Sequence, residues 1–295
     1  MRWAGPVHLH PSVILCGIQP PPPVPGTVCM EGLRAMLRAS RRRLLAIGLV
    51  TALVAAFPAA VSASHSWGSY HWARTANPFT LKVVDSVGSA WDSYLDTTIV
   101  DWTKSDVLNL AEQAGSVAKG KTCKAVSGKV NVCNNTYGNN GWLGVATIWA
   151  SGNHITQGTV KVNDTYFNTA TYNTPAWRNL VMCQEVGHTL GLDHQDENFN
   201  NANLGTCMDY TNDPDGGAGG ASSTDPSNEH PNTHDYDQLK TIYAHLDSTT
   251  TVGQVVNSGS APGWGRVIRD NGRSALFVHD LGNGMAIFSF VIWAR

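Results

Sequence analysis

One short segment of the sequence carries side chains that could hold and use a metal ion, residues 183–194, CQEVGHTLGLDH. On an α-helix Gln184 and His188 are one turn apart and share a face, and Glu185 lies beside them. Gly191 can adopt a positive φ, which would let the chain leave the helix and return His194 toward the same point. A zinc hydrolase needs such an arrangement, because a carboxylate beside the ligands takes a proton from metal-bound water.

The spacing matches H-E-x-x-H-x-x-G-x-x-H at every defining position except the first, where Gln184 stands in place of histidine. Downstream, residues 207–210 read CMDY. Together these strings resemble the metzincin clan of zinc peptidases, and especially its matrixin-like secreted bacterial members. The second string resembles the clan's Met-turn, which places a methionine beneath the metal-binding histidines. Residues 144–163 resemble the clan's substrate-binding edge-strand region, and residues 234–239 resemble the start of its closing helix.

The resemblance implies a role for each matching residue: Glu185 as the general base, Gln184, His188 and His194 as zinc ligands, Gly191 and Met208 as structural residues, and Tyr210 as an auxiliary catalytic group. It implies a zinc-dependent endopeptidase acting on a peptide or protein substrate. An extended peptide is expected to pair with the edge strand near residues 159–162. The segment after residue 248 is not explained by the resemblance.

Gln184 leaves three interpretations open. An amide oxygen can coordinate zinc, but it is neutral and a poorer donor than imidazole. Another histidine could complete the site, namely His154, His230 or His234. In the third interpretation the site has lost its metal, and the chain is a catalytically inactive peptide- or protein-binding module. Glu185 favours a working site, because a buried carboxylate without a metal or partner is costly.

A calcium loop is a weaker candidate. Asp209, Asp213 and Asp215 are followed by Gly216 and Gly217. Carboxylate oxygens suit Ca²⁺, but the spacing does not fit an EF-hand, and a solvated acidic loop is the simpler interpretation.

The N-terminal region predicts export. A basic cluster at 38–43 is followed by the uncharged apolar run 44–56 and then by small residues at 61–63. These features together predict a signal peptide over residues 36–63. The apolar run is shorter than the roughly 20 residues of a membrane-spanning helix. We therefore expect a secreted protein that keeps no stable membrane anchor after signal cleavage.

Residues 1–35 precede this signal, so we expect them to be a mis-assigned extension, with translation starting at Met30 or Met36. The chain has 295 residues, 20 Lys+Arg and 22 Asp+Glu, for a formal charge of −2. Cleavage after Ala63 would leave 232 residues with 14 basic and 21 acidic side chains, a charge of −7. This composition gives no basic surface for nucleic acid. The product is expected to be a monomer.

Four cysteines follow the predicted signal: Cys123, Cys133, Cys183 and Cys207. In an oxidising compartment we expect sequence neighbours to pair, 123 with 133 and 183 with 207, although four cysteines allow three connectivities. The second bridge would join the active-site helix to the Met-turn. It closes a loop of 25 residues, which contributes on the order of 3 kcal/mol to stability.

Hydrophobic periodicity predicts the elements that position these residues. Strands are expected at 80–84, 142–150 and 159–163, the last near a sheet edge, with helices at 87–118, 176–190 and 235–246 and polar loops at 119–141 and 198–232. The predicted fold is α+β, with a twisted, mainly parallel sheet and an active-site helix in a catalytic domain at 64–247. A linker at 248–265 and a small β-rich tail at 266–295 would follow it.

Overall fold

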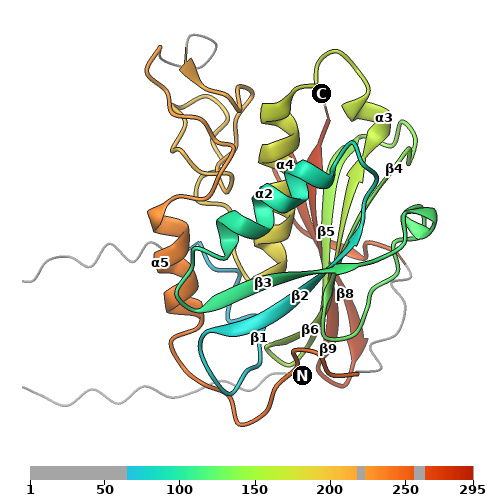
Figure 1. Cartoon of the computed structure of the whole chain (residues 1–295), viewed down its shortest axis with the longest axis vertical. Coiled ribbons are helices and arrows are strands. Elements are labelled where there is room, and N and C mark those ends of the chain that lie inside the picture. Colours follow the sequence, from blue (N-terminus) through green and yellow to red (C-terminus); the bar gives the residue numbers. More distant parts are fainter. Residues whose placement is uncertain (1–64, 218–222, 256–262, 295) are drawn as a thin grey trace, which may run out of the picture. The chain divides into compact units, whose positions relative to one another are not determined.

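A nine-stranded mixed sheet runs through the part of the chain that the structure describes (Figure 1). The structure is a computed structural model, and it describes residues 65–217, 223–255 and 263–294. The predicted signal peptide and upstream extension lie outside these residues. The strands are β1 (His71–Trp72), β2 (Phe79–Ser86), β3 (Leu108–Ala114), β4 (Val130–Asn135), β5 (Trp142–Ser151), β6 (His154–Asn163), β7 (Arg266–Asp270), β8 (Ser274–Gly282) and β9 (Met285–Trp293).

The strand order is β3-β2-β4-β6-β5-β9-β8-β7, and β1 pairs with β6. The pairs among β1, β2, β3, β4 and β6 are parallel, whereas β5, β7, β8 and β9 pair antiparallel with their neighbours. The sheet is therefore mixed rather than mainly parallel. The α+β class is confirmed.

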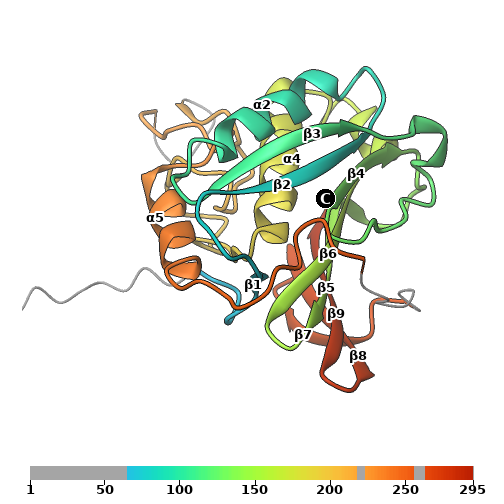
Figure 2. The same ribbon diagram turned by 60° about the horizontal axis from the view of Figure 1, so that its bottom comes forward.

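Within the described residues four α-helices accompany the sheet: α2 (Asp92–Trp102), α3 (Asp164–Phe167), α4 (Pro175–Thr189) and α5 (Thr233–Ile242). α2 and α4 lie side by side on one face of the sheet (Figures 1 and 2). The start of α4 follows from its sequence, because the Thr174 side chain accepts a hydrogen bond from Trp177 N and Pro175 occupies the first turn. None of the helices in the described segments is long and apolar enough to cross a membrane.

The predicted helix at 87–118 is wrong in its second half. α2 ends at Trp102, and β3 follows with alternating burial. Leu108 and Leu110 alternate with more exposed residues, and β3 pairs with β2, so sheet pairing overrides the helical spacing. The predicted loop at 119–141 likewise contains β4, whose Val130 and Val132 are fully buried between β2 and β6.

The predicted edge strand at 159–163 is not an edge. It forms the second half of β6, which lies between β4 and β5 inside the sheet. The other antiparallel neighbour of β5 is β9, which pairs with it from Trp142 to Ser151. The expected pairing of a peptide with residues 159–162 is therefore excluded in this structure, because those backbone groups already bond to other strands.

The C-terminal region is β-rich as predicted. β8 and β9 form a hairpin whose turn contains Asn283 at φ 53°, and Asn271-Gly272 turns the chain between β7 and β8. Through β9 these strands continue the main sheet. Both expected disulfides are present, Cys123–Cys133 and Cys183–Cys207, each with a Cα–Cα distance of 5.9 Å.

Candidate metal centre

Helix α4 brings the predicted site residues together in the core. Gln184, Glu185 and His188 are each at most 1% exposed. The helix ends at Thr189, and Gly191, two residues later, adopts φ +98°. A Cβ atom there would lie 2.5 Å from the carbonyl oxygen of Tyr70, so both the backbone angle and the space require glycine.

The turn at Gly191 returns His194 to His188. Their Nε2 atoms lie 3.0 Å apart, with the rings nearly perpendicular at 85°. His188 Nδ1 lies 2.9 Å from the Leu192 carbonyl oxygen, to which it can only donate, so the neutral ring presents the lone pair of Nε2 to His194. Burial, followed by the effect of His194, lowers the pKa of His188 to about 3. Two imidazole nitrogens at this distance can share a bound cation or a proton.

Three charged residues surround the other side of His194. Its Nδ1 lies 3.4 Å from Asp193 Oδ1 and 3.5 Å from Glu197 Oε1. Arg269 of β7 forms ion pairs with both carboxylates, at 2.6 Å to Asp193 and 2.9 Å to Glu197. Carboxylates at the outer nitrogen orient a histidine ligand and increase its basicity. Burial disfavours the charged imidazolium of His194, but the two carboxylates outweigh it and raise the pKa of this histidine.

The Gln184 amide has one hydrogen bond, from Nε2 to the carbonyl oxygen of Cys207 at 2.9 Å. A carbonyl accepts only from the NH₂ group, so this bond fixes which end of the amide is which. Oε1 is buried and has no hydrogen-bond partner among the described residues. Such an oxygen is costly unless a cation or a donor meets it.

Glu185 lies against β5. Its carboxylate accepts a hydrogen bond from the backbone of Ala146, while Oε2 has no partner in the described chain. Burial raises the pKa of Glu185 well above its ordinary value, which the Ala146 bond offsets only in part. Gly144 makes room for the side chain, because a Cβ atom there would lie 2.6 Å from Glu185 Oε1.

The CMDY string lies under α4. The Cys183–Cys207 bridge holds it to the helix, and a Cβ atom at Gly187 would lie 2.7 Å from the sulfur of Met208. The Tyr210 ring packs on His194, with centroids 4.2 Å apart. Met208 therefore lies against the helix that carries His188, and Tyr210 lies beside His194.

The C-terminal strand covers the site. The ring of Phe290 in β9 stacks on His188, with centroids 4.3 Å apart and an interplanar angle of 8°. Trp67 contacts both Phe288 and Phe290 edge-on. The motif did not predict this cover, or the role of Arg269, because both come from the last 30 residues of the chain.

The alternative ligands are engaged elsewhere. His154 Nε2 lies 3.2 Å from Asp247, His230 Nδ1 lies 2.6 Å from Asp101, and His234 stacks on His65 at 4.7 Å. None of the three meets the His188–His194 pair in these contacts. The second interpretation of Gln184, in which one of them completes the site, therefore has no support.

The calcium candidate also lacks support. Asp209 Oδ2 accepts hydrogen bonds from Leu204 N and Asn228 Nδ2. Among the described residues, the groups of His, Cys, Asp and Glu with metal-ligand spacing do not include Asp209, Asp213 or Asp215. One of these groups is the Asp193, His194 and Glu197 set beside the predicted zinc ligands.

Comparison with known proteins adds no relative. No family model and no curated protein matches this chain. The chemical interpretation therefore depends on the sequence motif and on the geometry given above.

Proposed function

We propose that the chain is a secreted, metzincin-like zinc endopeptidase. The observation that carries the proposal is the 3.0 Å approach of His188 Nε2 and His194 Nε2, produced by a helix and a glycine turn with zinc-motif spacing. The two disulfides support export, because such bridges persist in oxidising compartments.

The residues present fit a zinc ion. His188 and His194 offer imidazole nitrogens whose outer atoms are oriented by Leu192 and by carboxylates. Gln184 Oε1, buried and without a hydrogen bond in the described chain, is the third donor. This set would hold zinc more weakly than three histidines.

When bound, zinc would supply the Lewis acidity that polarises a peptide carbonyl and acidifies water. Glu185 would do the proton transfer. Its Oε2 lacks a hydrogen bond to any described residue, so it is available to accept a proton from water and to pass it to the leaving amine. Ala146 holds the carboxylate from the other side. Asp193 and Glu197 would keep the His194 ring in position.

The deciding experiment measures zinc content and peptide cleavage on the same preparations. We expect wild-type protein to contain zinc and to cleave casein or a peptide library in a chelator-sensitive way. Glu185→Gln should keep the zinc and lose cleavage by about 10²–10⁴-fold, because it removes the general base. Asp280→Asn, at an exposed position of β8, is the control and should behave as wild type. Wild-type protein without zinc or cleavage would contradict the proposal.

A non-catalytic binding module is the second candidate, and β9 favours it. This strand pairs along β5, and Phe290 lies over His188. Both features leave less room for a substrate. The module predicts little zinc at His188 and His194 and no effect of Glu185→Gln on binding of its partner.

A further inference from the structure

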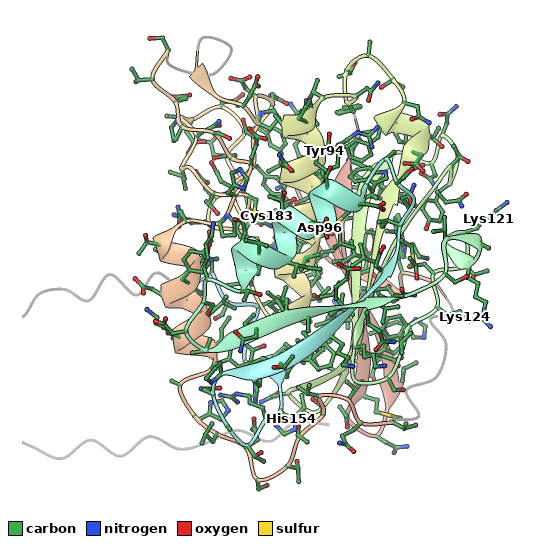
Figure 3. The ribbon with its side chains drawn as sticks, viewed as in Figure 1. Tyr94, Asp96, Lys121, Lys124, His154 and Cys183 are labelled. Atoms are coloured by element: carbon green, nitrogen blue, oxygen red, sulfur yellow. A yellow bond between two sulfur atoms is a disulfide. The ribbon has the colours of Figure 1, made fainter. Side chains whose placement is uncertain are left out.

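A second group of metal-ligating side chains lies away from helix α4. It combines His71 of β1, His154 at the start of β6, and His245 and Asp247 in the segment after α5. Figure 3 places His154 at the end of the sheet remote from Cys183 of α4. The metzincin motif includes none of these four residues.

Four donor atoms converge there. Asp247 Oδ1 lies 3.3 Å from His71 Nε2, 3.2 Å from His154 Nε2 and 3.6 Å from His245 Nε2. His245 Nε2 lies 3.2 Å from His71 Nε2. Four donors arranged tetrahedrally around zinc, each at about 2.0–2.1 Å, would lie about 3.3 Å from one another. These four separations have about this size, and the ligand atoms of His71, His154 and Asp247 all lie within 4.8 Å of one another.

Hydrogen bonds with neighbouring groups orient two of the donor atoms. Asp247 Oδ2 accepts hydrogen bonds from Arg74 Nη1 at 2.7 Å and Arg74 N at 3.1 Å, which leaves Oδ1 for the histidines. His71 Nδ1 lies 2.7 Å from the carbonyl oxygen of Ser69, so Nδ1 carries the hydrogen and the neutral ring offers the lone pair of Nε2. Outer contacts of this kind orient metal ligands.

The group is also reachable from solvent. The side chains of His71 and Asp247 are 6% and 8% exposed, whereas those of His154 and His245 are 38% and 55% exposed. An ion can therefore enter from the exposed side and meet a fixed inner pair of ligands. Three imidazoles and one carboxylate select a borderline transition metal such as zinc over calcium or magnesium.

We propose that His71, His154, His245 and Asp247 bind a divalent transition-metal ion, zinc by preference, as a closed structural site. The ion would tie β1, the start of β6 and the segment after α5 to one point. The proposal does not depend on peptidase activity or on metal at His188 and His194.

The test uses the mature chain and separates the two centres by a background variant. His188→Ala removes a predicted ligand of the centre formed by Gln184, His188 and His194, hereafter the α4 centre. Metal that this variant retains therefore belongs elsewhere. We expect it to bind one equivalent of Co²⁺ with the visible absorption of tetrahedral coordination, and to bind Zn²⁺ in competition. Adding His245→Ala should weaken metal binding by at least about 100-fold. Losing even a hydrogen-bond partner of a metal ligand costs about 10–100-fold in affinity, and this variant loses a ligand itself.

Two further variants complete the design. His154→Ala, at another exposed ligand, should act as His245→Ala does, and His279→Ala on β8 should leave binding unchanged. Chelator should lower the melting temperature of His188→Ala but not that of His188→Ala/His245→Ala. The proposal is overturned if His188→Ala binds no cobalt. Equal binding with and without His245 would also overturn it.

Discussion

Gln184 is held at one end only. Its Nε2 donates to Cys207, and its Oε1 has no hydrogen bond within the described residues. A histidine at this position could donate from one ring nitrogen to the same carbonyl and present the other nitrogen to the site. The surroundings of residue 184 thus suit either side chain, and the two differ in the strength of the donor that they offer.

Gln184→His should strengthen zinc binding at the α4 centre by at least about tenfold, because imidazole is a better zinc ligand than a neutral amide. Competition with a chromophoric chelator in the His245→Ala background measures this centre without the second cluster. Gln184→Ala is the matched control and should weaken binding. Equal affinity of the wild-type and Gln184→His centres would argue that residue 184 is not a ligand.

The raised pKa of Asp209 predicts that the stability of the fold depends on pH. Burial raises its pKa from 3.8 to about 6, although hydrogen bonds from Leu204 and Asn228 favour its charged form. A carboxyl with a raised pKa binds its proton more tightly in the folded chain than in the unfolded chain. Its contribution to stability is therefore full below about pH 4 and is lost as the pH rises through about 6.

Asp209→Asn should remove this contribution, so the variant gains stability relative to wild type as the pH rises from about 4 to about 7. The amide oxygen can replace Oδ2 as the acceptor from Leu204 N. Urea unfolding across this range gives the difference directly. Asp280→Asn, at an exposed position, should run parallel to wild type. A constant offset between Asp209→Asn and wild type would refute the assignment.

At the scale of elements, β9 decides how open the candidate site is. Along this strand, Phe290 and Ile292 join the main core, whereas Val291 joins a smaller cluster with Phe277 and Trp142. Alternate residues of a strand face opposite sides of the sheet, so Phe290 covers His188 from the α4 side. Phe290 therefore limits access to His188.

Phe290→Leu should speed the removal of metal from the α4 centre by a chelator, because it takes away the stacked ring while keeping most of the apolar volume. Phe277→Leu is the control, since it lies in the neighbouring strand and in the other cluster. Stopped-flow chelation measures the rates. Under the proposed peptidase activity, peptide cleavage should rise in the first variant only. Identical release rates in both variants would show that Phe290 does not gate the site.

At the scale of the whole molecule, the two disulfides have different structural roles. Cys123–Cys133 closes a local loop, whereas Cys183–Cys207 joins helix α4 to the CMDY turn. Cys207 also supplies the carbonyl that holds Gln184. The second bridge therefore couples global stability to the geometry of the site.

Replacing Cys183 and Cys207 by alanine should lower the free energy of unfolding by about 3 kcal/mol, because the unfolded chain regains the entropy of a 25-residue loop. Zinc affinity at the α4 centre should fall as well. The matched Cys123→Ala/Cys133→Ala variant should lose comparable stability and keep its zinc affinity. Urea unfolding measures the loss of stability in both variants, and zinc titration measures their affinity at the α4 centre. Equal zinc affinity in the two variants would contradict the prediction.

The sequence by itself determined the local parts of this protein. The spacing of Gln184, Glu185 and His188 on α4, the turn at Gly191 and the pairing of neighbouring cysteines all follow from residues close together in the chain. Helical periodicity, a positive φ and short loop closure act over a few residues to a few tens of residues, so they can be inferred without the fold.

Tertiary structure decided the remainder. β3 and β4 have weak local signals and become strands because β2 and β6 offer them partners. Arg269 and Phe290 reach the site from the C-terminal strands, and the second histidine group draws on segments more than 170 residues apart, as His71 and His245 show. Such contacts depend on strand order, register and burial across the whole sheet, and no local pattern encodes them.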